Sequence, residues 1–463
     1  MHALVENALR RVVAHLRELP GQPMHDTAGG RKRSRALVGR LPEHGRPGDD
    51  VLRQLFDHVI PASLNTASPG YLGYIPGGGI FPAAVADFVA DATNRYVGIW
   101  QAGPGPVAVE LAVLRWFREL VGFPSSGGGV LTTGGSMANL LAVVSARRDR
   151  LPADFLRGVL YASDQVHHSV VKAALVAGFP EERVRALPSD GAFRLRLDAL
   201  DEHVARDRAA GLQPFMLVAS AGTTHTGAVD DLGACADAAR EHGLWFHVDA
   251  AYGGFFLLTE HGRSLLAGIH RADSVTLDPH KGLFLPYGTG CVLVRDVETL
   301  RRAHRVQADY LPPPRGDDGL WDFADLSPEL SRDWRGLRVW LPLQLHGAAA
   351  FRAALNEKLA LARLLHAELA ARRWIDVVAP PQLSLLAFRA RAPDLPPDEA
   401  DALTRRLLSG VNQQQRVFLS GTSVRGRPVL RACVLSFRTH EDRIRLLLED
   451  LDRVGRELGL AGP

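Results

Sequence analysis

The feature that most constrains the fold is an alternation between about residues 79 and 345, where short apolar runs are separated by amphipathic segments. The runs fall at 158–162, 215–220, 244–248, 274–277 and 290–294. Runs of this length indicate buried strands, whereas the segments between them, such as 138–148 and 234–242, have helical spacing. Strands that alternate with helices predict an α/β fold, in which a mainly parallel sheet is covered by helices on both faces.

The N-terminal residues follow a different pattern. Within 1–78 we expect a helix near 2–19, a loop rich in Gly, Pro and Arg near 20–48, and a helix near 50–60. Such an arm has too little apolar sequence to fold alone. We therefore expect it to pack on a second subunit.

The C-terminal third, 346–463, shifts to long helical patterns with a few strands, near 383–389 and 430–437. This mixture predicts a smaller α+β domain. The chain is thus expected to have three parts: an N-terminal arm (1–78), a large domain (79–345) and a small domain (346–463).

Composition argues against several classes of protein. The net charge is only +3, so nothing indicates general attraction to nucleic acid or to a membrane, and the basic cluster at 31–35 is expected to be a solvated loop. The three cysteines, Cys235, Cys291 and Cys433, have neither metal-ligand spacing nor a disulfide framework, and we predict no metal site. No 18-residue apolar segment exists, and charged residues interrupt the first helical pattern as they would not in a signal peptide. We expect a cytoplasmic protein.

Two polar side chains that follow apolar runs indicate the chemistry. Asp249 ends the run in His247-Val248-Asp249, and Lys281 follows the next run, 32 positions later. In open α/β sheets, ligands bind at the carboxyl ends of the strands. An amine there can hold an aldehyde as a Schiff base, and an aspartate can keep a pyridine nitrogen protonated, so the pair predicts pyridoxal 5′-phosphate. We expect no acid beside Lys281, so that this buried lysine loses its proton or is derivatised.

Three further motifs suit the same cofactor. Gly135 and Ser136 open a helix after an apolar run, where free backbone N–H groups can bind a phosphate. His167 follows another run, and its imidazole can stack on the ring and move protons. Thr224 lies in a turn rich in Gly and Thr, where its hydroxyl can bond the ring. The alternatives are an ordinary helix cap, a surface or core histidine and a simple β-turn.

Together these motifs resemble the group II pyridoxal-phosphate-dependent decarboxylases, among them the aromatic L-amino-acid, tyrosine, histidine and glutamate decarboxylases. The resemblance covers about residues 68–345. It implies the fold of aspartate aminotransferase (fold type I) and an obligate homodimer with its active sites at the interface. It also implies decarboxylation of an L-amino acid to the amine through an aldimine with Lys281 and a quinonoid.

The resemblance further implies a role for each matching residue. Lys281 is the Schiff-base lysine and Asp249 the pyridine partner. The other implied roles are ring stacking for His167, phosphate binding for Gly135 and Ser136, cofactor contacts for Thr224, Asp278 and His280, and substrate contacts for Tyr74, Ile75, Pro76 and Trp100. An acid then protonates the α-carbon; His167, His280 and a loop tyrosine are the candidates.

Several departures from the family pattern leave the aromatic substrate open. Asp278 stands where many members have Asn, and Ile75 where many have Phe. The Trp usual after the lysine is Gly282, so we expect a more open pocket floor. Val107 and Ala108 replace a usual Thr-Glu pair.

The loop near 311–333 carries the proton-donating tyrosine of the family. The matching residue here is Phe323, which has no proton to give. The alternative function is therefore an aldehyde synthase, in which dioxygen takes the electrons. Tyr310, in the same loop, could act as the acid instead. An aminotransferase or carbon–carbon lyase of the same fold is a further alternative, and a scaffold without activity is another.

Overall fold

The computed structural model describes residues 1–306 and 321–461. The chain divides into two compact units. The larger comprises Gly79–Ala362 and Ala379–Leu386, and the smaller comprises Met1–Gly78, Arg363–Val378 and Ala387–Pro463. In the structure the N-terminal and C-terminal segments fall into one unit. The division into three parts stays a prediction.

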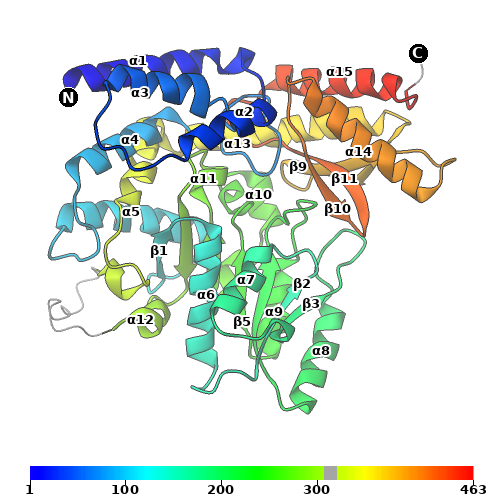
Figure 1. Cartoon of the computed structure of the whole chain (residues 1–463). Coiled ribbons are helices and arrows are strands. Elements are labelled where there is room, and N and C mark those ends of the chain that lie inside the picture. Colours follow the sequence, from blue (N-terminus) through cyan, green and yellow to red (C-terminus); the bar gives the residue numbers. More distant parts are fainter. Residues whose placement is uncertain (307–320, 462–463) are drawn as a thin grey trace. The chain divides into compact units, whose positions relative to one another are not determined.

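A seven-stranded sheet forms the centre of the larger unit, in the order β1-β7-β6-β5-β4-β2-β3 (Figure 1). The strands are β1 (Gly128–Thr132), β2 (Gly158–Ser163), β3 (Val184–Leu187), β4 (Gln213–Ser220), β5 (Trp245–Asp249), β6 (Ser274–Leu277) and β7 (Gly290–Val294). Four of the six pairings are parallel, and only those of β7 are antiparallel. Every residue of β1, β2, β5, β6 and β7 is buried, as expected for a sheet covered on both faces. The predicted α/β fold with a mainly parallel sheet is confirmed.

Helices surround this sheet. They are α4 (Phe81–Thr93), α5 (Pro104–Val121), α6 (Gly135–Arg150), α7 (His168–Val176), α8 (Leu197–Ala209), α9 (Leu232–Glu241), α10 (Glu260–Leu265), α11 (Pro279–Gly282), α12 (Glu298–His304) and α13 (Arg335–Ala370). Helix α5 has Pro104 in its first turn and Gly122 as a left-handed C-cap, the residues that favour these positions. Helix α13 is interrupted at Gly347, whose φ is 67°, and its residues from Arg363 belong to the smaller unit.

The smaller unit contains helices from both ends of the chain: α1 (His2–Glu18), α2 (Thr27–Ser34), α3 (Gly48–Gln54), α14 (Pro397–Gln413) and α15 (Glu441–Glu457). A four-stranded sheet has the order β10-β11-β9-β8. Its strands are β8 (Ile375–Ala379), β9 (Leu385–Ala390), β10 (Ser420–Val424) and β11 (Arg427–Cys433).

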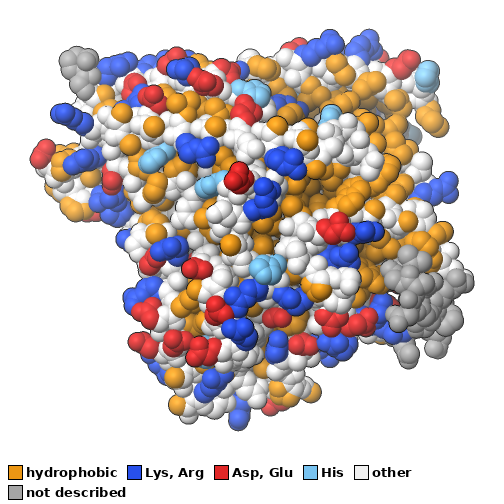
Figure 2. Space-filling view, turned by 180° about the vertical axis from the view of Figure 1, so that it is seen from behind, with side chains coloured by type: hydrophobic (Ala, Val, Ile, Leu, Met, Phe, Trp, Pro, Cys, Tyr) orange, Lys and Arg blue, Asp and Glu red, His pale blue; other side chains and the backbone are white. Residues whose placement is uncertain are grey.

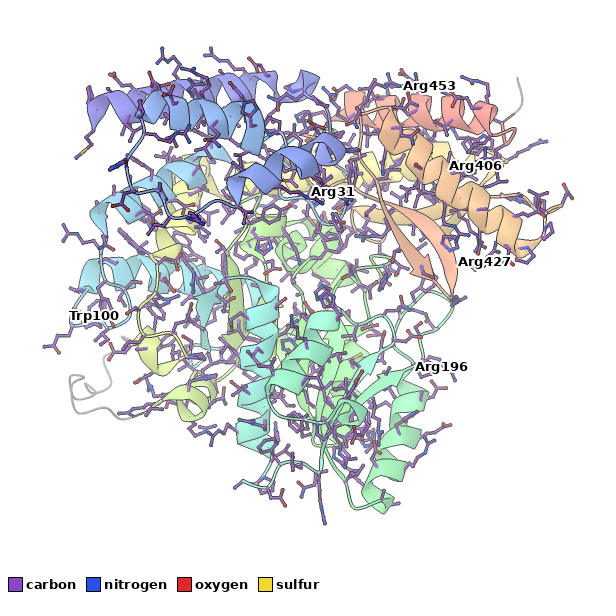
Figure 3. The ribbon with its side chains drawn as sticks, viewed as in Figure 1. Arg31, Trp100, Arg196, Arg406, Arg427 and Arg453 are labelled. Atoms are coloured by element: carbon purple, nitrogen blue, oxygen red, sulfur yellow. The ribbon has the colours of Figure 1, made fainter. Side chains whose placement is uncertain are left out.

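Helix α2 corrects one expectation, because it lies inside the segment 20–48 predicted as a loop. A Cβ on Gly30 would lie 2.7 Å from the Cβ of Ala62, so the helix packs closely on the residues after α3. Gly30, which suggested a loop, instead permits this contact. The arginine cluster is therefore partly helical, and Figure 3 labels Arg31 on this helix. Among the described helices, none is long and apolar enough to cross a membrane.

Candidate active site

The site residues gather where the parallel strands end. Asp249 is the last residue of β5, and β6, its parallel neighbour, leads through Asp278 into the short helix α11. Lys281 lies on the single turn of α11. Because the carboxyl ends of adjacent parallel strands meet at one edge, the topology brings the aspartate and the lysine together.

Lys281 has an acid as its neighbour, which corrects the expectation that it has none. Its Nζ lies 2.8 Å from Oδ2 of Asp278, a carboxylate that is only 2% exposed. The two residues are three apart on one helical turn, a spacing that places side chains side by side. The amine is thus held as half of an ion pair rather than as an isolated buried base.

His280 completes this cluster. Its Nδ1 donates to the carbonyl oxygen of Thr289 at 2.6 Å, so the ring presents Nε2 on its other side, 3.7 Å from Oδ2 of Asp278. Burial lowers the pKa of His280, and the charge of Asp278 partly opposes this. A neutral imidazole in this position can exchange a proton with the Asp278–Lys281 pair.

Asp249 is held by two donors from the protein. Its Oδ2 accepts from Nδ2 of Asn139 at 3.0 Å, and its Oδ1 accepts from the backbone N–H of Ala251 at 3.2 Å. The residue is 8% exposed. A carboxylate fixed at both oxygens in this way is suited to face a protonated pyridine nitrogen.

His167 caps α7, since its Nδ1 accepts from the backbone N–H of Ser169. The same Nδ1 lies 2.7 Å from Oγ of Ser169. Burial lowers the pKa of His167, and the negative charge of Asp249 partly opposes that shift. The charges of Lys281 and Asp278 act on this ring as well, so the predicted stacking residue belongs to the same cluster.

The start of α6 offers an anion site next to the cluster. The N-cap residue Gly134 has a φ of 155°, and no side chain caps the helix. A Cβ on Gly135 would lie 2.9 Å from Oδ2 of Asp278, so only glycine allows this approach. Backbone N–H groups at a helix N-terminus favour a phosphate. Ser136 is exposed at the same turn.

These residues fit pyridoxal phosphate in one further respect. Oδ1 of Asp278 is buried and has no hydrogen-bond partner among the described residues. A buried carboxylate oxygen without a donor is costly, and a bound group that offers a proton there would satisfy it. An amine, a carboxylate for the ring nitrogen and a free helix start thus lie along one edge of the sheet.

The other residues predicted for the site are Thr224, Trp100, Tyr74, Ile75 and Pro76. Thr224 is half-buried in the turn after β4, at the same sheet edge. Trp100, labelled in Figure 3, is half-buried, and its backbone N–H donates to Asp322 at 2.7 Å. Tyr74, Ile75 and Pro76 belong to the smaller unit, so their contact with substrate stays a prediction.

Phe323 is enclosed by the protein. It begins a short 3₁₀ helix (Phe323–Asp325), is 0% exposed, and lies under the guanidinium of Arg332 at 4.9 Å from the ring centroid. The next residue, Ala324, donates its N–H to the carbonyl of Gly98. The ring therefore serves packing in this arrangement. Tyr310, the other candidate from the loop, lies outside the described residues.

Gly282 does not open the pocket floor, contrary to the expectation from its missing side chain. A Cβ at this position would lie 2.7 Å from the Cβ of Phe255. Phe255 is 1% exposed and packs edge-on against Phe117, with ring centroids 5.0 Å apart. The Phe255 ring occupies the space beside the glycine.

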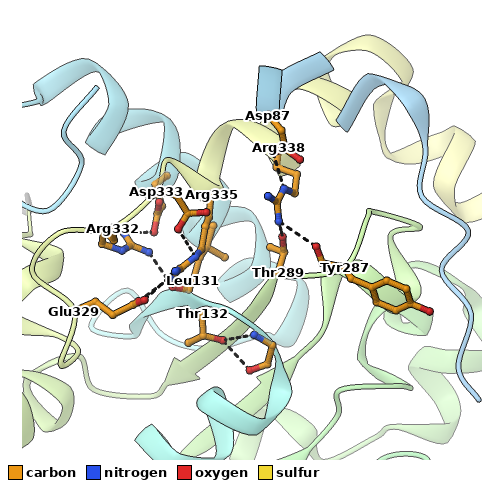
Figure 4. A network of polar contacts seen from close by, with 12 residues as sticks. Asp87, Leu131, Thr132, Tyr287, Thr289, Glu329, Arg332, Asp333, Arg335 and Arg338 are labelled. Carbon is orange, nitrogen blue, oxygen red and sulfur yellow. Dashed lines mark hydrogen bonds and ion pairs between the residues drawn. The ribbon is translucent and has the colours of Figure 1, made fainter. Parts of the chain in front are cut away.

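Three arginines near β1 and β7 each form an ion pair with an acidic residue (Figure 4). Arg332 pairs with Glu110 at 2.7 Å, and both side chains are fully buried. Arg335 pairs with Glu329 at 2.6 Å, and both arginines also donate to the carbonyl of Leu131 in β1. The third, Arg338, pairs with Asp87 at 2.6 Å. Arg332 and Arg335 thus support β1, the strand that leads into α6, whereas Arg338 donates to Thr289 just before β7.

The sequence interpretation missed the residues behind Asp249, namely Asn139, Ser169, His247, Ser274 and Thr276, all of which are buried. A signal for them was available. Polar residues at alternate positions of a buried strand lie on one face, as do His247 and Asp249 on β5. Among the described residues, no group of three or more His, Cys, Asp or Glu could hold a metal ion.

Comparisons with known proteins identify the family. Residues 32–391 match the pyridoxal-dependent decarboxylase conserved domain. The chain is 34% identical to the aromatic-L-amino-acid decarboxylase of Bacillus atrophaeus, over 100% of this chain and 97% of the relative. It is 30% identical to the phenylacetaldehyde synthase of Arabidopsis thaliana, over 88% of this chain and 86% of the relative.

A solved structure shows the same fold. Oryza sativa TDC, determined with PLP and tryptamine, superposes with a TM-score of 0.94 at 28% identity, covering 98% of this chain and 97% of that one. The enzyme uses pyridoxal 5′-phosphate and is a carboxy-lyase. The chain belongs to the family of pyridoxal-dependent decarboxylases.

Proposed function

We propose that this decarboxylase acts on an aromatic L-amino acid and releases the amine. The observation that carries the proposal is the cluster of Lys281, Asp249 and His167 beside the free start of α6. The similarity to an aromatic-L-amino-acid decarboxylase over the whole chain supports the substrate class. Arg332, Arg335 and Arg338 are each paired with an acid, which favours a substrate without an acidic side chain.

The cofactor, when bound, supplies an electron sink for the bond to the departing carboxylate. Lys281 supplies the amine that holds it, and Asp278 keeps that amine in place beforehand. Asp249 would offer a carboxylate to the ring nitrogen, and His167 would cover the ring. His280 can hold a proton at Nε2 beside Asp278.

We propose that Tyr310 is the acid that protonates the α-carbon, a role for which Phe323 has no proton. The enclosure of Phe323 under Arg332 supports this, because a fully buried ring in a bonded turn is not a loop residue that reaches substrate. The second candidate function is aldehyde synthesis, favoured by the similarity to phenylacetaldehyde synthase.

A matched pair of variants decides between the two products. Purified enzyme is supplied with each standard L-amino acid, and carbon dioxide, amine and hydrogen peroxide are measured together. We expect aromatic substrates to give equal amounts of carbon dioxide and amine without peroxide. Tyr310→Phe is expected to raise peroxide, whereas Phe323→Tyr leaves the products unchanged. Peroxide from the parent enzyme, abolished by Phe323→Tyr, would establish the aldehyde synthase instead.

We also propose a homodimer. On α4, Phe81, Val85, Phe88 and Val89 are each more than a third exposed, and their spacing places them on one helix face. Figure 2 shows that apolar side chains are exposed over part of the surface. Such an exposed apolar face favours contact with another protein. A second copy of this chain agrees with the expectation that the N-terminal arm packs on another subunit. Phe88→Glu is expected to reduce the mass measured by light scattering; an unchanged dimer would exclude this face.

We propose a cytoplasmic location as well. Cys235 and Cys291 are buried free cysteines, which suits a reducing compartment. Fractionation of the source cells, followed by assay of decarboxylation in each fraction, tests this. Activity confined to a secreted or membrane fraction would contradict it.

A further inference from the structure

The amide of Asn139 on α6 has all of its hydrogen-bonding positions occupied. Its Nδ2 donates to Oδ2 of Asp249 at 3.0 Å and to Oγ of Ser169 at 2.8 Å. Its Oδ1 accepts from Oγ1 of Thr276 at 2.7 Å and from Nε2 of His247 at 3.1 Å. Asn139 is 1% exposed, so these four contacts are its whole polar environment.

The chain of contacts continues beyond His247 to Ser274 and Trp245. The indole N–H of Trp245 can only donate, and it lies 2.8 Å from Oγ of Ser274. Ser274 accepts this hydrogen and can direct its own hydroxyl hydrogen to Nδ1 of His247, at 2.8 Å. With that arrangement His247 carries its hydrogen on Nε2 and donates it to Asn139. Burial lowers the pKa of His247 to about 4, so its ring is neutral at pH 7, as this tautomer requires.

The opposite end of the network fixes the orientation of the amide. The carboxylate of Asp249 accepts hydrogen bonds, so it requires the Nδ2 side of Asn139 to face it. The oxygen side then faces His247, whose Nε2 carries the hydrogen that this oxygen accepts. The two ends leave only one orientation of the amide with every partner satisfied.

The same amide reaches His167 through Ser169. Nδ1 of His167 accepts from the backbone N–H of Ser169, so the hydroxyl of Ser169 must donate to it as well. Oγ of Ser169 is then free to accept from Asn139. The ring hydrogen of His167 consequently lies on Nε2.

Strand geometry explains why these side chains meet. Trp245, His247 and Asp249 alternate along β5 and so share one face. The parallel register with β6 places His247 opposite Ser274 and Asp249 opposite Thr276. Helix α6 covers this face and supplies Asn139.

We propose that Asn139 is a positioning residue that fixes both the Asp249 carboxylate and the His167 imidazole from one buried amide. The Asp249 carboxylate would thereby be held for the pyridine nitrogen, and His167 would be held with its hydrogen on Nε2. The inference rests on the proposed roles of Asp249 and His167 toward the cofactor. It adds the group that sets their orientation before the cofactor arrives.

The test uses full-length protein freed of cofactor and 4′-deoxypyridoxine 5′-phosphate, which has the pyridine nitrogen and the phosphate but no aldehyde. Its dissociation constant is measured by fluorescence quenching between pH 6 and 9. Asn139→Asp keeps the shape but places a second carboxylate against Asp249, so the two share a proton and Asp249 loses its full charge. We expect binding to weaken about 10- to 100-fold, as outer-shell substitutions do at metal sites, with a changed pH dependence.

Ser145→Ala is the matched control. Ser145 is buried on the same helix, and its hydroxyl has no hydrogen-bond partner among the described residues. We expect the parent dissociation constant for this variant. An Asn139→Asp protein that melts like the parent and binds the analogue within twofold of it would overturn the proposal.

Ser274→Ala decides the matter should Asn139→Asp fail to fold. Without that hydroxyl, His247 can carry its hydrogen on Nδ1, and the oxygen of Asn139 then loses the donor that holds it. We expect the analogue to bind about 3- to 10-fold more weakly, since fewer bonds hold the Asn139 amide toward Asp249. An unchanged dissociation constant and pH dependence would overturn the proposal.

Ser169→Ala separates positioning from general loosening. It releases His167 and leaves the bond from Asn139 to Asp249, so the analogue should weaken less than with Asn139→Asp. Equal losses in the two variants would overturn the assignment. If the parent binds neither the analogue nor pyridoxal phosphate, the proposed roles of Asp249 and His167 fail instead; if the parent binds and the variants bind as tightly, only Asn139 is misassigned.

Discussion

Asp249 and Asp278 are two buried carboxylates at the same edge of the sheet, with different surroundings. Both oxygens of Asp249 accept hydrogen bonds, from Asn139 and from the backbone of Ala251. Asp278 faces Lys281 with one oxygen, and its other oxygen has no partner among the described residues. One carboxylate is fully satisfied by the protein, and the other is satisfied only in part.

This contrast indicates that Asp249 and Asp278 have different roles in one site. A charge that stabilises a reaction is most effective when its partners are fixed in advance, because nothing must reorganise as the charge develops. Asp249 meets that condition. Asp278 shares its charge with the amine of Lys281, which must change its bonding when it captures an aldehyde. Its partners therefore change during use of the site.

Removing the amine should have the largest effect. Lys281→Ala is expected to lower decarboxylation by about 10³-fold or more, since loss of a covalent group disables the whole catalytic unit. Lys172→Ala, which changes an exposed lysine on α7, is the control and should keep the parent rate. Rates are measured as carbon dioxide released under excess cofactor. A Lys281→Ala enzyme with the parent rate would end the assignment of this lysine.

Replacement of Asp249, the carboxylate with fixed partners, should have the next largest effect. Asp249→Asn keeps the shape but removes the negative charge that would face the ring nitrogen, and its amide N–H₂ would meet a donor that the carboxylate oxygen accepts from. We expect kcat/KM to fall by about 10²- to 10³-fold, the range for loss of one preorganised electrostatic contact. Steady-state kinetics with an aromatic substrate provide the measurement. A loss below tenfold would mean that Asp249 is a structural residue.

Replacement of Asp278, the carboxylate whose partners change, should have the opposite effect: a gain in the rate of cofactor capture rather than a loss of activity. Asp278→Asn removes a negative charge beside the phosphate-binding helix start and releases the ammonium group of Lys281 from its partner. We expect the cofactor-free enzyme to capture pyridoxal phosphate up to about tenfold faster, equivalent to 1.4 kcal/mol. Stopped-flow absorbance measures the rate. Slower capture in Asp278→Asn, with Asp249→Asn unaffected, would reverse the comparison.

Much of the fold follows from the sequence because its strands are buried on both faces. The predicted runs correspond to β2 and β4–β7, whose residues are all buried except the first two of β4. Strand β3 was missed, since it lies at the sheet edge and three of its four residues are not fully buried. Helix α2 was missed because its glycines are packing contacts rather than loop residues.

The site was predictable only where one residue carries the signal. Lys281 and Asp249 each follow an apolar run, so their common edge could be inferred. The pairing of Lys281 with Asp278 depends on α11 being helical, which four residues containing a proline do not suggest. Asn139 required knowledge of which strands pair, because its partners come from three segments far apart in the sequence.

The smallest effect should appear in stability, on the Asp249 side alone. His247 has a pKa of about 4 in the folded protein, below its usual 6.5. Between these values the unfolded chain binds a proton that the folded protein does not, so stability is lost as pH falls. From pH 7.5 to 5 this amounts to about 2 kcal/mol, or a few degrees in melting temperature.

His247→Gln removes the titrating group and keeps a donor toward Asn139, so its melting temperature should fall less over the same pH range. The pKa of His304 is also about 4, but that residue contributes equally to parent and variant and cancels in the comparison. Thermal unfolding followed by circular dichroism at several pH values provides the measurement. Parallel curves for the two proteins would mean that His247 is already protonated, and the hydrogen-bond direction that holds Asp249 would then be lost.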